Sequence, residues 1–82
     1  MKKLSELRIG ETGVIKSFAA DNIFIKLMEM GCIPGEVVKV EQIALLGDPI
    51  SISISGYQLS LRLNEADMIW VENISQKEKA IK

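Results

Sequence analysis

The side chains able to do chemistry are few in this sequence, and their spacing forms no known catalytic or metal-binding set. The chain has no histidine, which removes the commonest general base and the commonest metal ligand. Its one thiol, Cys32, follows a predicted helix, where we expect a small apolar residue packed in the core rather than a nucleophile. We therefore predict no catalytic residue, no metal site, no cofactor and no enzymatic activity. The acidic residues are scattered, and we interpret these four as solvated surface charges: Asp21, Glu29, Asp48 and Asp67.

Length and composition indicate one small globular domain. The chain has 82 residues, of which 48% are hydrophobic and 26% charged. A net charge of −1 gives no basic excess, so nucleic acid is not expected as a partner. No apolar stretch approaches the roughly 20 residues that span a bilayer, and the N-terminus lacks the features of a signal peptide. We predict a cytoplasmic domain over residues 1–74 that does not insert into the membrane, and a disordered polar tail over residues 75–82.

Apolar and polar residues alternate in five segments, which predicts a mostly β fold. The clearest case is residues 50–55, where isoleucines occupy one face and serines the other. In residues 12–19 the alternation is imperfect and does not decide which face is buried. Because short antiparallel strands with one dry face need a cover, we expect a small barrel with a helix plugging one opening. A helical turn capped by Asn64 is expected before the last strand. The remaining predicted strands are residues 36–43, 59–63 and 68–72.

Residues 21–31, after the first strand, carry the only helical pattern in the chain. Asp21 suits the N-cap position, where a carboxylate accepts a bond from a free amide of the first turn. Gly31 suits the left-handed position that ends a helix. Pro34-Gly35 then predicts a type II turn, since proline presets the first central dihedral and glycine adopts the positive second one.

The helix carries more apolar residues than one buried side needs. Its apolar arc spans roughly 220° at about 100° per residue, whereas a surface helix needs a stripe a little over 100° wide. Three residues align on the side assigned to the core: Ile23, Leu27 and Met30. Phe24 and Ile25, with Met28 at the edge, are the candidate partner-binding surface.

Two further apolar segments bear on this surface. The loop Ala44-Leu45-Leu46 is an alternative cover for the helix flank, which would leave no surface for a partner. Trp70 is a second candidate contact residue, because it faces outward if Ile69 and Val71 face inward. Packing of Trp70 against the C-terminal tail is the alternative.

Several motifs resemble those of the FeoA family, the small accessory proteins of bacterial ferrous iron transport. The run K-L-M-E-M-G-C-I-P-G-E-V-V-K-V over residues 26–40 carries the resemblance, together with L-G-D-P-I from Leu46 and G-Y-Q-L-S-L-R from Gly56. The resemblance implies an SH3-like barrel and docking on the cytoplasmic GTP-binding part of the FeoB transporter. By position it adds Leu27 and Met28 to the partner-binding residues.

Two departures from the family pattern bear on docking. Lys26 stands where the family usually has arginine, whose planar fork lysine lacks. Phe24 and Ile25 replace residues that are often charged in the family, which indicates either self-association through the apolar helix flank or a partner specific to this chain.

Three other functions are compatible with the sequence. A stand-alone relative of the SH3-like C-terminal domain of iron-dependent repressors, acting as a protein-interaction module, is the principal alternative. A nucleic-acid-binding SH3-like module would bind in a salt-sensitive manner. A metal chaperone would take up a transition metal ion in a manner that depends on Cys32.

Overall fold

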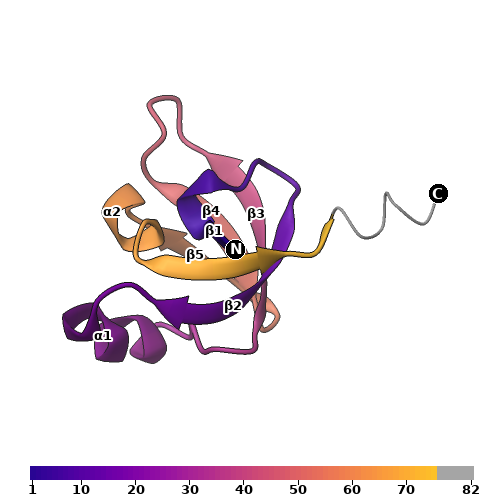
Figure 1. Cartoon of the computed structure of the whole chain (residues 1–82). Coiled ribbons are helices and arrows are strands. Elements are labelled where there is room, and N and C mark those ends of the chain that lie inside the picture. The colour runs from indigo at the N-terminus through magenta and orange to yellow at the C-terminus, as the bar shows by residue number, and fades with distance from the viewer. Residues whose placement is uncertain (76–82) are drawn as a thin grey trace.

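Six strands form one antiparallel sheet in the order β1-β6-β2-β3-β4-β5 (Figure 1). The structure is a computed structural model that describes residues 1–75, apart from the side chain of Asp21. The strands are β1 (Lys2–Lys3), β2 (Thr12–Phe18), β3 (Val37–Ile43), β4 (Ile50–Ile54), β5 (Tyr57–Leu61) and β6 (Ile69–Asn73). The helical elements are η1 (Leu4–Glu6), η2 (Asp21–Ile23), α1 (Phe24–Glu29) and α2 (Leu63–Ala66). The predicted tail over residues 75–82 lies outside the described residues, except for Ser75.

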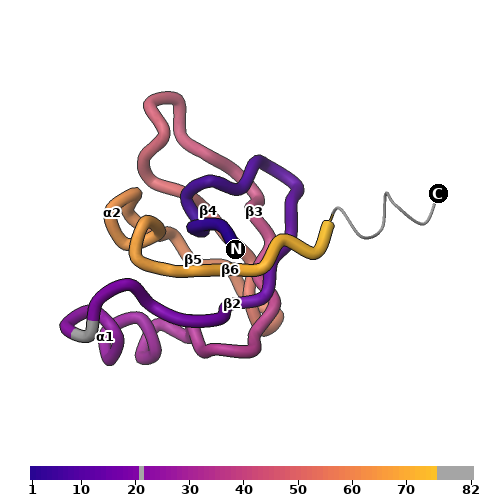
Figure 2. Tube along the Cα trace, viewed as in Figure 1, coloured from indigo at the N-terminus to yellow at the C-terminus, as the bar shows by residue number. Residues whose placement is uncertain are grey.

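The sheet confirms the predicted mostly β class and adds one strand to the five expected. β1 is only two residues long, and Lys2 and Lys3 pair with Val71 and Trp70 of β6. β6 in turn lies beside β2, although the two strands are far apart in sequence (Figure 2). A two-residue strand of lysines has no apolar alternation, so the sequence pattern could not reveal it.

A bulge at Lys16 explains the imperfect alternation in β2. Ile15 pairs with Val71, and Phe18 pairs with Ile69, with a register shift between Ile15 and the residue after Lys16. An extra residue in one strand changes the parity of the side chains beyond it. Ile15 and Phe18 therefore both pack with the core, although they are three positions apart.

β3 has a second bulge, at Glu41. Val40 pairs with Ile52 and Ile43 pairs with Ile50, so the inward row continues across the extra residue. β4 itself keeps the strict alternation that the sequence predicted, with its three isoleucines buried. Glu41 is held on the outer side, where its Oε2 accepts a 2.8 Å hydrogen bond from Ser53 Oγ.

The segment after β5 differs from the prediction, because Leu63 begins a helix and is not part of a strand. Two carboxylates accept bonds from backbone N–H groups there: Glu65 Oε1 from Arg62 at 2.9 Å, and Asp48 Oδ1 from Leu63 at 3.0 Å. Arg62 is the N-cap of α2, and the prediction of Asn64 as the cap was wrong, since Asn64 already lies inside the helix. Orphan N–H groups at a helix start need such acceptors.

The core is one cluster to which the sheet, α1, α2 and η1 all contribute. The predicted core side of the helix is confirmed: Leu27 is fully buried, and Ile23 and Met30 pack partly buried against the cluster. The buried hydrophobic residues are Leu4, Leu7, Ile15, Leu27, Cys32, Val38, Val40, Ile50, Ile52, Ile54, Leu61, Ala66, Ile69 and Val71.

The α-helical part of the predicted 21–31 helix is shorter than expected, because its first turn is the 3₁₀ element η2. The predicted cap at Asp21 concerns a side chain outside the described part of the structure. Gly31 ends the helix with φ +100°, as predicted. Gly35 has φ +97°, and the Glu36 N–H donates to the Ile33 carbonyl at 3.0 Å, which agrees with the expected type II turn.

Candidate partner-binding surface

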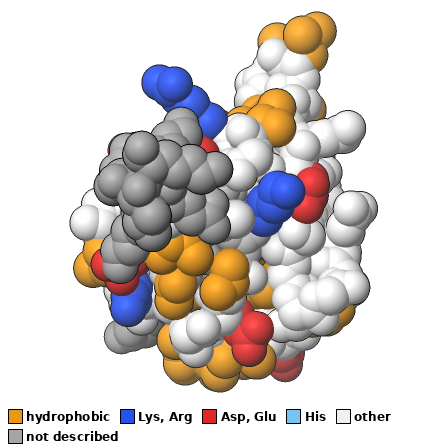
Figure 3. All heavy atoms as spheres, turned by 90° about the vertical axis from the view of Figure 1, so that its right-hand side faces the viewer, with side chains coloured by type: hydrophobic (Ala, Val, Ile, Leu, Met, Phe, Trp, Pro, Cys, Tyr) orange, Lys and Arg blue, Asp and Glu red, His pale blue; other side chains and the backbone are white. Residues whose placement is uncertain are grey.

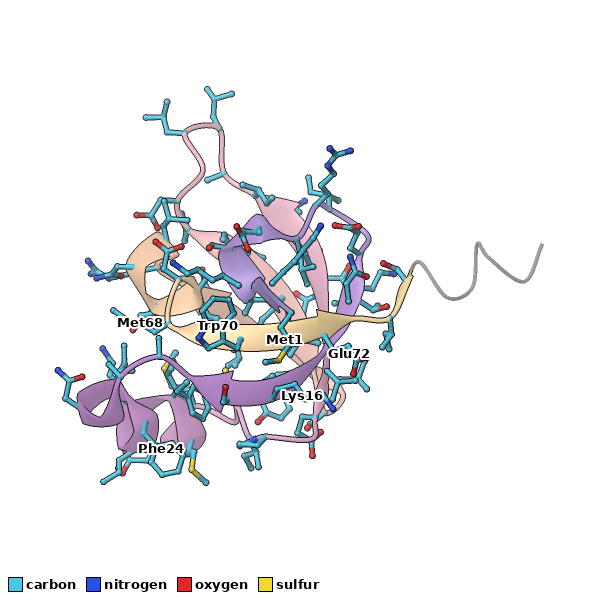
Figure 4. The ribbon with its side chains drawn as sticks, viewed as in Figure 1. Met1, Lys16, Phe24, Met68, Trp70 and Glu72 are labelled. Atoms are coloured by element: carbon cyan, nitrogen blue, oxygen red, sulfur yellow. The ribbon has the colours of Figure 1, made fainter. Side chains whose placement is uncertain are left out.

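The outer side of α1 leaves apolar side chains in contact with solvent. Ile25 is 68% exposed and Phe24 40%, while Met28 is half-buried. We call these three residues the helix flank. The Phe24 ring meets the Phe18 ring edge-on, with centroids 5.4 Å apart and an interplanar angle of 66°. This aromatic contact with β2 orients Phe24, which Figure 4 shows on α1.

Leu27 does not share this surface, although the family resemblance placed it among the partner-binding residues. Its side chain is fully buried in the core, because it lies on the inner side of α1 with Ile23 and Met30. A change at Leu27 therefore acts on packing before it acts on any partner.

The loop after β3 does not cover the helix flank, so that alternative is wrong. The loop forms the end of the β3–β4 hairpin, which projects from the opposite end of the protein from α1 (Figure 1). Leu45 is 99% exposed and Leu46 is 91% exposed. The sequence signal for this second exposed apolar site is a pair of adjacent leucines in a loop that continues into Gly-Asp-Pro.

Trp70 lies on the outer face of β6, as its buried neighbours Ile69 and Val71 require. It is half-buried, and the Lys3 ammonium lies 5.8 Å from its ring centroid, within the range of a cation–π contact. In Figure 4, β2 runs between Trp70 and α1, so the tryptophan and the helix flank are not one patch. The alternative contact of Trp70 with the tail involves residues that the structure does not describe.

An ion pair joins α1 to α2 behind the helix flank. Lys26 Nζ lies 3.0 Å from Glu65 Oε2, and the Glu65 side chain is almost completely buried. The pKa of the Glu65 carboxyl is lowered, first by the bond from the Arg62 N–H and then by Lys26, although burial opposes the shift. Lysine thus serves here as a point charge on one carboxylate oxygen, while the other oxygen accepts from the backbone.

The hydroxyl end of the Tyr57 side chain, from β5, lies close to Gly31 at the C-terminal end of α1. The tyrosine hydroxyl lies so close to the Cα of Gly31 that a β-carbon at this position would collide with it. Two features therefore favour glycine at position 31: the backbone has a positive φ, and the Tyr57 hydroxyl occupies the space of a β-carbon.

Cys32 is a core residue, as predicted. It is fully buried, and burial raises the pKa of its thiol to about 11, with a further contribution from the Glu65 carboxylate. Among residues 1–75, no three His, Cys, Asp or Glu side chains are grouped so that they could hold a metal ion.

No helix in the described range is long and apolar enough to cross a membrane.

Comparison with known proteins assigns the family. The sequence model of the FeoA domain matches residues 2–73, nearly the whole chain. The chain belongs to the FeoA family. Over 74 residues it is 40% identical to a fusion protein of Fe(2+) transport protein A and Fe(2+) transporter FeoB from Porphyromonas gingivalis. That alignment covers 89% of this chain but only 9% of the fusion protein.

Solved FeoA structures share the fold. A FeoA-like protein from Clostridium acetobutylicum has a TM-score of 0.84 and 34% identity, over 89% of this chain and 86% of its own. FeoA from Stenotrophomonas maltophilia, solved with zinc and described as an SH3 domain protein, has a TM-score of 0.74 and 28% identity, over 88% of this chain and 91% of its own. The SH3-like expectation is thereby confirmed. IdeR from T. acidophilum and two structures of a manganese-dependent transcriptional repressor, at 21% to 23% identity, share the fold alone.

Proposed function

We propose that this chain is a non-enzymatic cytoplasmic accessory protein of bacterial ferrous iron uptake. It binds the cytoplasmic GTP-binding part of a FeoB-type transporter and modulates it. The observation that supports this partner is the Porphyromonas gingivalis relative, in which transport protein A and FeoB occur in one chain. Fusion keeps two domains at a high effective concentration. A separate chain needs a surface that holds the partner by itself, and we assign the helix flank to this contact.

The helix flank suits such a contact because its side chains are apolar and already positioned. Ordering side chains on binding lowers affinity, so a preorganised surface binds more tightly. The edge-on contact with Phe18 orients Phe24, and the Lys26–Glu65 ion pair ties α1 to α2. The complementary surface on the partner is expected to be an apolar groove that takes Ile25 near its centre.

Binding to the isolated cytoplasmic domain of the cognate transporter, measured by calorimetry with GTP or GDP bound, tests this proposal. Ile25→Asp is the preferred variant, because Ile25 is more exposed than Phe24 and lacks its aromatic contact. We expect a loss of affinity of about tenfold or more, the usual effect of disrupting the centre of an interface. Phe24→Asp should also weaken binding, but with some loss of stability.

Leu45→Asp is the matched control, since it places the same charge on another exposed aliphatic residue at the opposite end of the protein. It should leave the affinity unchanged. Equal losses in both variants would indicate a general charge effect. An unchanged affinity of Ile25→Asp would exclude the helix flank, and no binding by the wild-type chain would exclude the transporter domain as the partner.

A protein-interaction module that works with a metal-dependent repressor is the second candidate, supported by the shared fold. The same calorimetric titration against a repressor without its C-terminal domain distinguishes the two. Binding there, without binding to the transporter domain, would replace our assignment.

A further inference from the structure

The β3–β4 hairpin ends in two leucines that have almost no contact with the rest of the protein. Leu45 is 99% exposed and Leu46 91%. The space-filling view shows hydrophobic side chains at the projecting end of the molecule, well separated from those at the opposite end (Figure 3). Isolated exposed leucines are common, whereas this adjacent pair forms a small apolar patch at the end of a projection, a candidate for an interaction site. We call these two residues the leucine tip.

The leucine tip is presented by a turn with internal hydrogen bonds. The Gly47 N–H donates to the Ala44 carbonyl at 2.7 Å, and the Ala44 N–H donates to the Pro49 carbonyl at 3.1 Å. Asp48 Oδ1 accepts from the Leu63 N–H, which ties the base of the turn to α2. Because these bonds satisfy backbone groups internally, less polar backbone must be dehydrated when the tip enters an apolar environment.

The small size of the leucine tip argues for a lipid surface over a protein. Specific protein interfaces use about 800 Å² and 20–30 residues from each partner, far more than two side chains supply. A bilayer imposes no such minimum, since apolar groups partition into it in proportion to their area. A narrow apolar projection with little surrounding surface therefore fits the boundary between headgroups and acyl chains.

The loop before β2 lies at the same end of the protein as the leucine tip and carries one apolar and one basic side chain that suit a lipid surface. It is bonded to β3, where the Gly10 N–H donates to the Val40 carbonyl at 2.8 Å. Ile9 in this loop is 60% exposed, and the neighbouring Arg8 is also exposed. A guanidinium beside aliphatic side chains suits a phosphate headgroup above the acyl layer.

We propose that the leucine tip inserts shallowly into the interfacial region of a lipid bilayer. The inference rests on the proposed function, because docking on a transporter brings the chain to the membrane. Two leucines carry fewer carbons than a myristoyl chain, which by itself gives only marginal binding. The tip therefore acts as the second of two signals. Since it lies opposite α1, it turns the helix flank away from the bilayer, toward the soluble part of the partner.

Amide NMR spectra of the full chain, recorded with vesicles of phosphatidylcholine and phosphatidylglycerol that contain a spin-labelled lipid, test the proposal. No transporter is needed, so the result does not depend on the proposed function. Paramagnetic broadening should be strongest at Leu45 and Leu46 and weaker at Ile9. Leu45→Ser/Leu46→Ser should lower the vesicle partition constant about tenfold or more. Ile25→Ser, the matched control on the helix flank, should not change it.

Either of two results would overturn the proposal. The first is no lipid-dependent broadening at millimolar lipid, or broadening centred on α1. The second is a serine double variant that binds vesicles like the wild type but loses affinity for the soluble transporter domain, which would place the leucine tip in a protein interface. Both leucines are exposed, so the double variant should retain the wild-type thermal midpoint, and a loss of fold cannot account for the result.

Discussion

Lys26 on α1 and Glu65 on α2 form an ion pair, with 3.0 Å between Nζ and Oε2, in which only the carboxylate is buried. The two partners are therefore unequal. Removing the lysine leaves a carboxylate that still accepts the Arg62 N–H, whereas removing the carboxylate leaves a backbone donor without its acceptor. The unequal burial gives the first prediction.

Glu65→Ala should lower the free energy of unfolding by about 1–3 kcal/mol, because the Arg62 N–H loses its acceptor and the helix loses a capping bond. Lys26→Ala should cost about 1 kcal/mol or less, since an exposed ammonium contributes little. Urea unfolding measures both, with Glu29→Ala as a control for loss of an exposed acidic side chain on α1. Equal losses from the two variants would contradict the proposed asymmetry.

Stability should fall in acid. The pKa of Glu65 is lowered mainly by the Arg62 N–H, and that of Glu11 by the Arg8 N–H and the Asn73 amide. Carboxyls with a lowered pKa in the folded state stabilise it above their unfolded pKa, near 4.5. This contribution is lost as the pH falls through the folded pKa. Free energies of unfolding measured from about pH 6 to pH 3 should decline below 4.5, and less steeply in Glu65→Gln. A profile that is flat in this range would contradict the assignment.

Gly31→Ala tests the contact with Tyr57. Gly35 provides the control, because it also has a positive φ but nothing within 4 Å of a β-carbon. Each alanine substitution should lower the free energy of unfolding by about 1–2 kcal/mol, because alanine is strained at a positive φ. Gly31→Ala should cost more, since it displaces the tyrosine ring, and this excess should vanish in a Tyr57→Ala background. If Gly31→Ala still lost more stability than Gly35→Ala in the Tyr57→Ala background, a contact with Tyr57 would not be the cause.

The thiol of Cys32 should be protected until the protein unfolds. It is fully buried, and burial raises its pKa to about 11. Modification by a disulfide reagent at pH 8 should be about a thousandfold or more slower than in urea, because it requires the rare unfolded state. Since the folded pKa is raised, the unfolded chain ionises first, and stability should also decline above pH 9. Rapid modification under native conditions would show that the core opens locally at this site.

If the helix flank also mediates self-association, Ile25→Asp should shift the chain toward the monomer in size-exclusion chromatography with light scattering. Ile25 is 68% exposed in the single chain, so self-association would bury this position between two copies of the protein. Burying the charge of an aspartate there would be unfavourable. The cytoplasmic transporter domain should compete with the same contact. A wild-type chain that stays monomeric at millimolar concentration would contradict this prediction.

The sequence predicted the strands in which apolar and polar side chains alternate regularly and no bulge interrupts the backbone. In β4 the serines and isoleucines alternate without interruption, and the inward face was correct. In β2 the bulge at Lys16 changes the parity, so a period of two could not describe both halves of the strand. Leu63 continued an alternating leucine pattern, but a helix starts there, stabilised by Glu65 of the helix itself and by Asp48 from the loop before β4.

The candidate surface was predictable only in part. Helical geometry correctly separated buried Leu27 from exposed Phe24 and Ile25, because the period of 3.6 residues sets the faces of a helix. It could not tell whether a loop would lie over the exposed side. The direction in which the leucine tip projects depends on the twist of the β3–β4 hairpin, which has no signature in single residues.

The two-residue strand β1 has a consequence for how the sheet meets its surroundings. It forms one margin of the sheet and consists of two lysines. Two copies that approached along this margin would bring like charges together before any backbone bonds could form. The two lysines therefore disfavour edge-to-edge pairing at β1, whereas β5, the opposite edge of the sheet, carries no charged side chain.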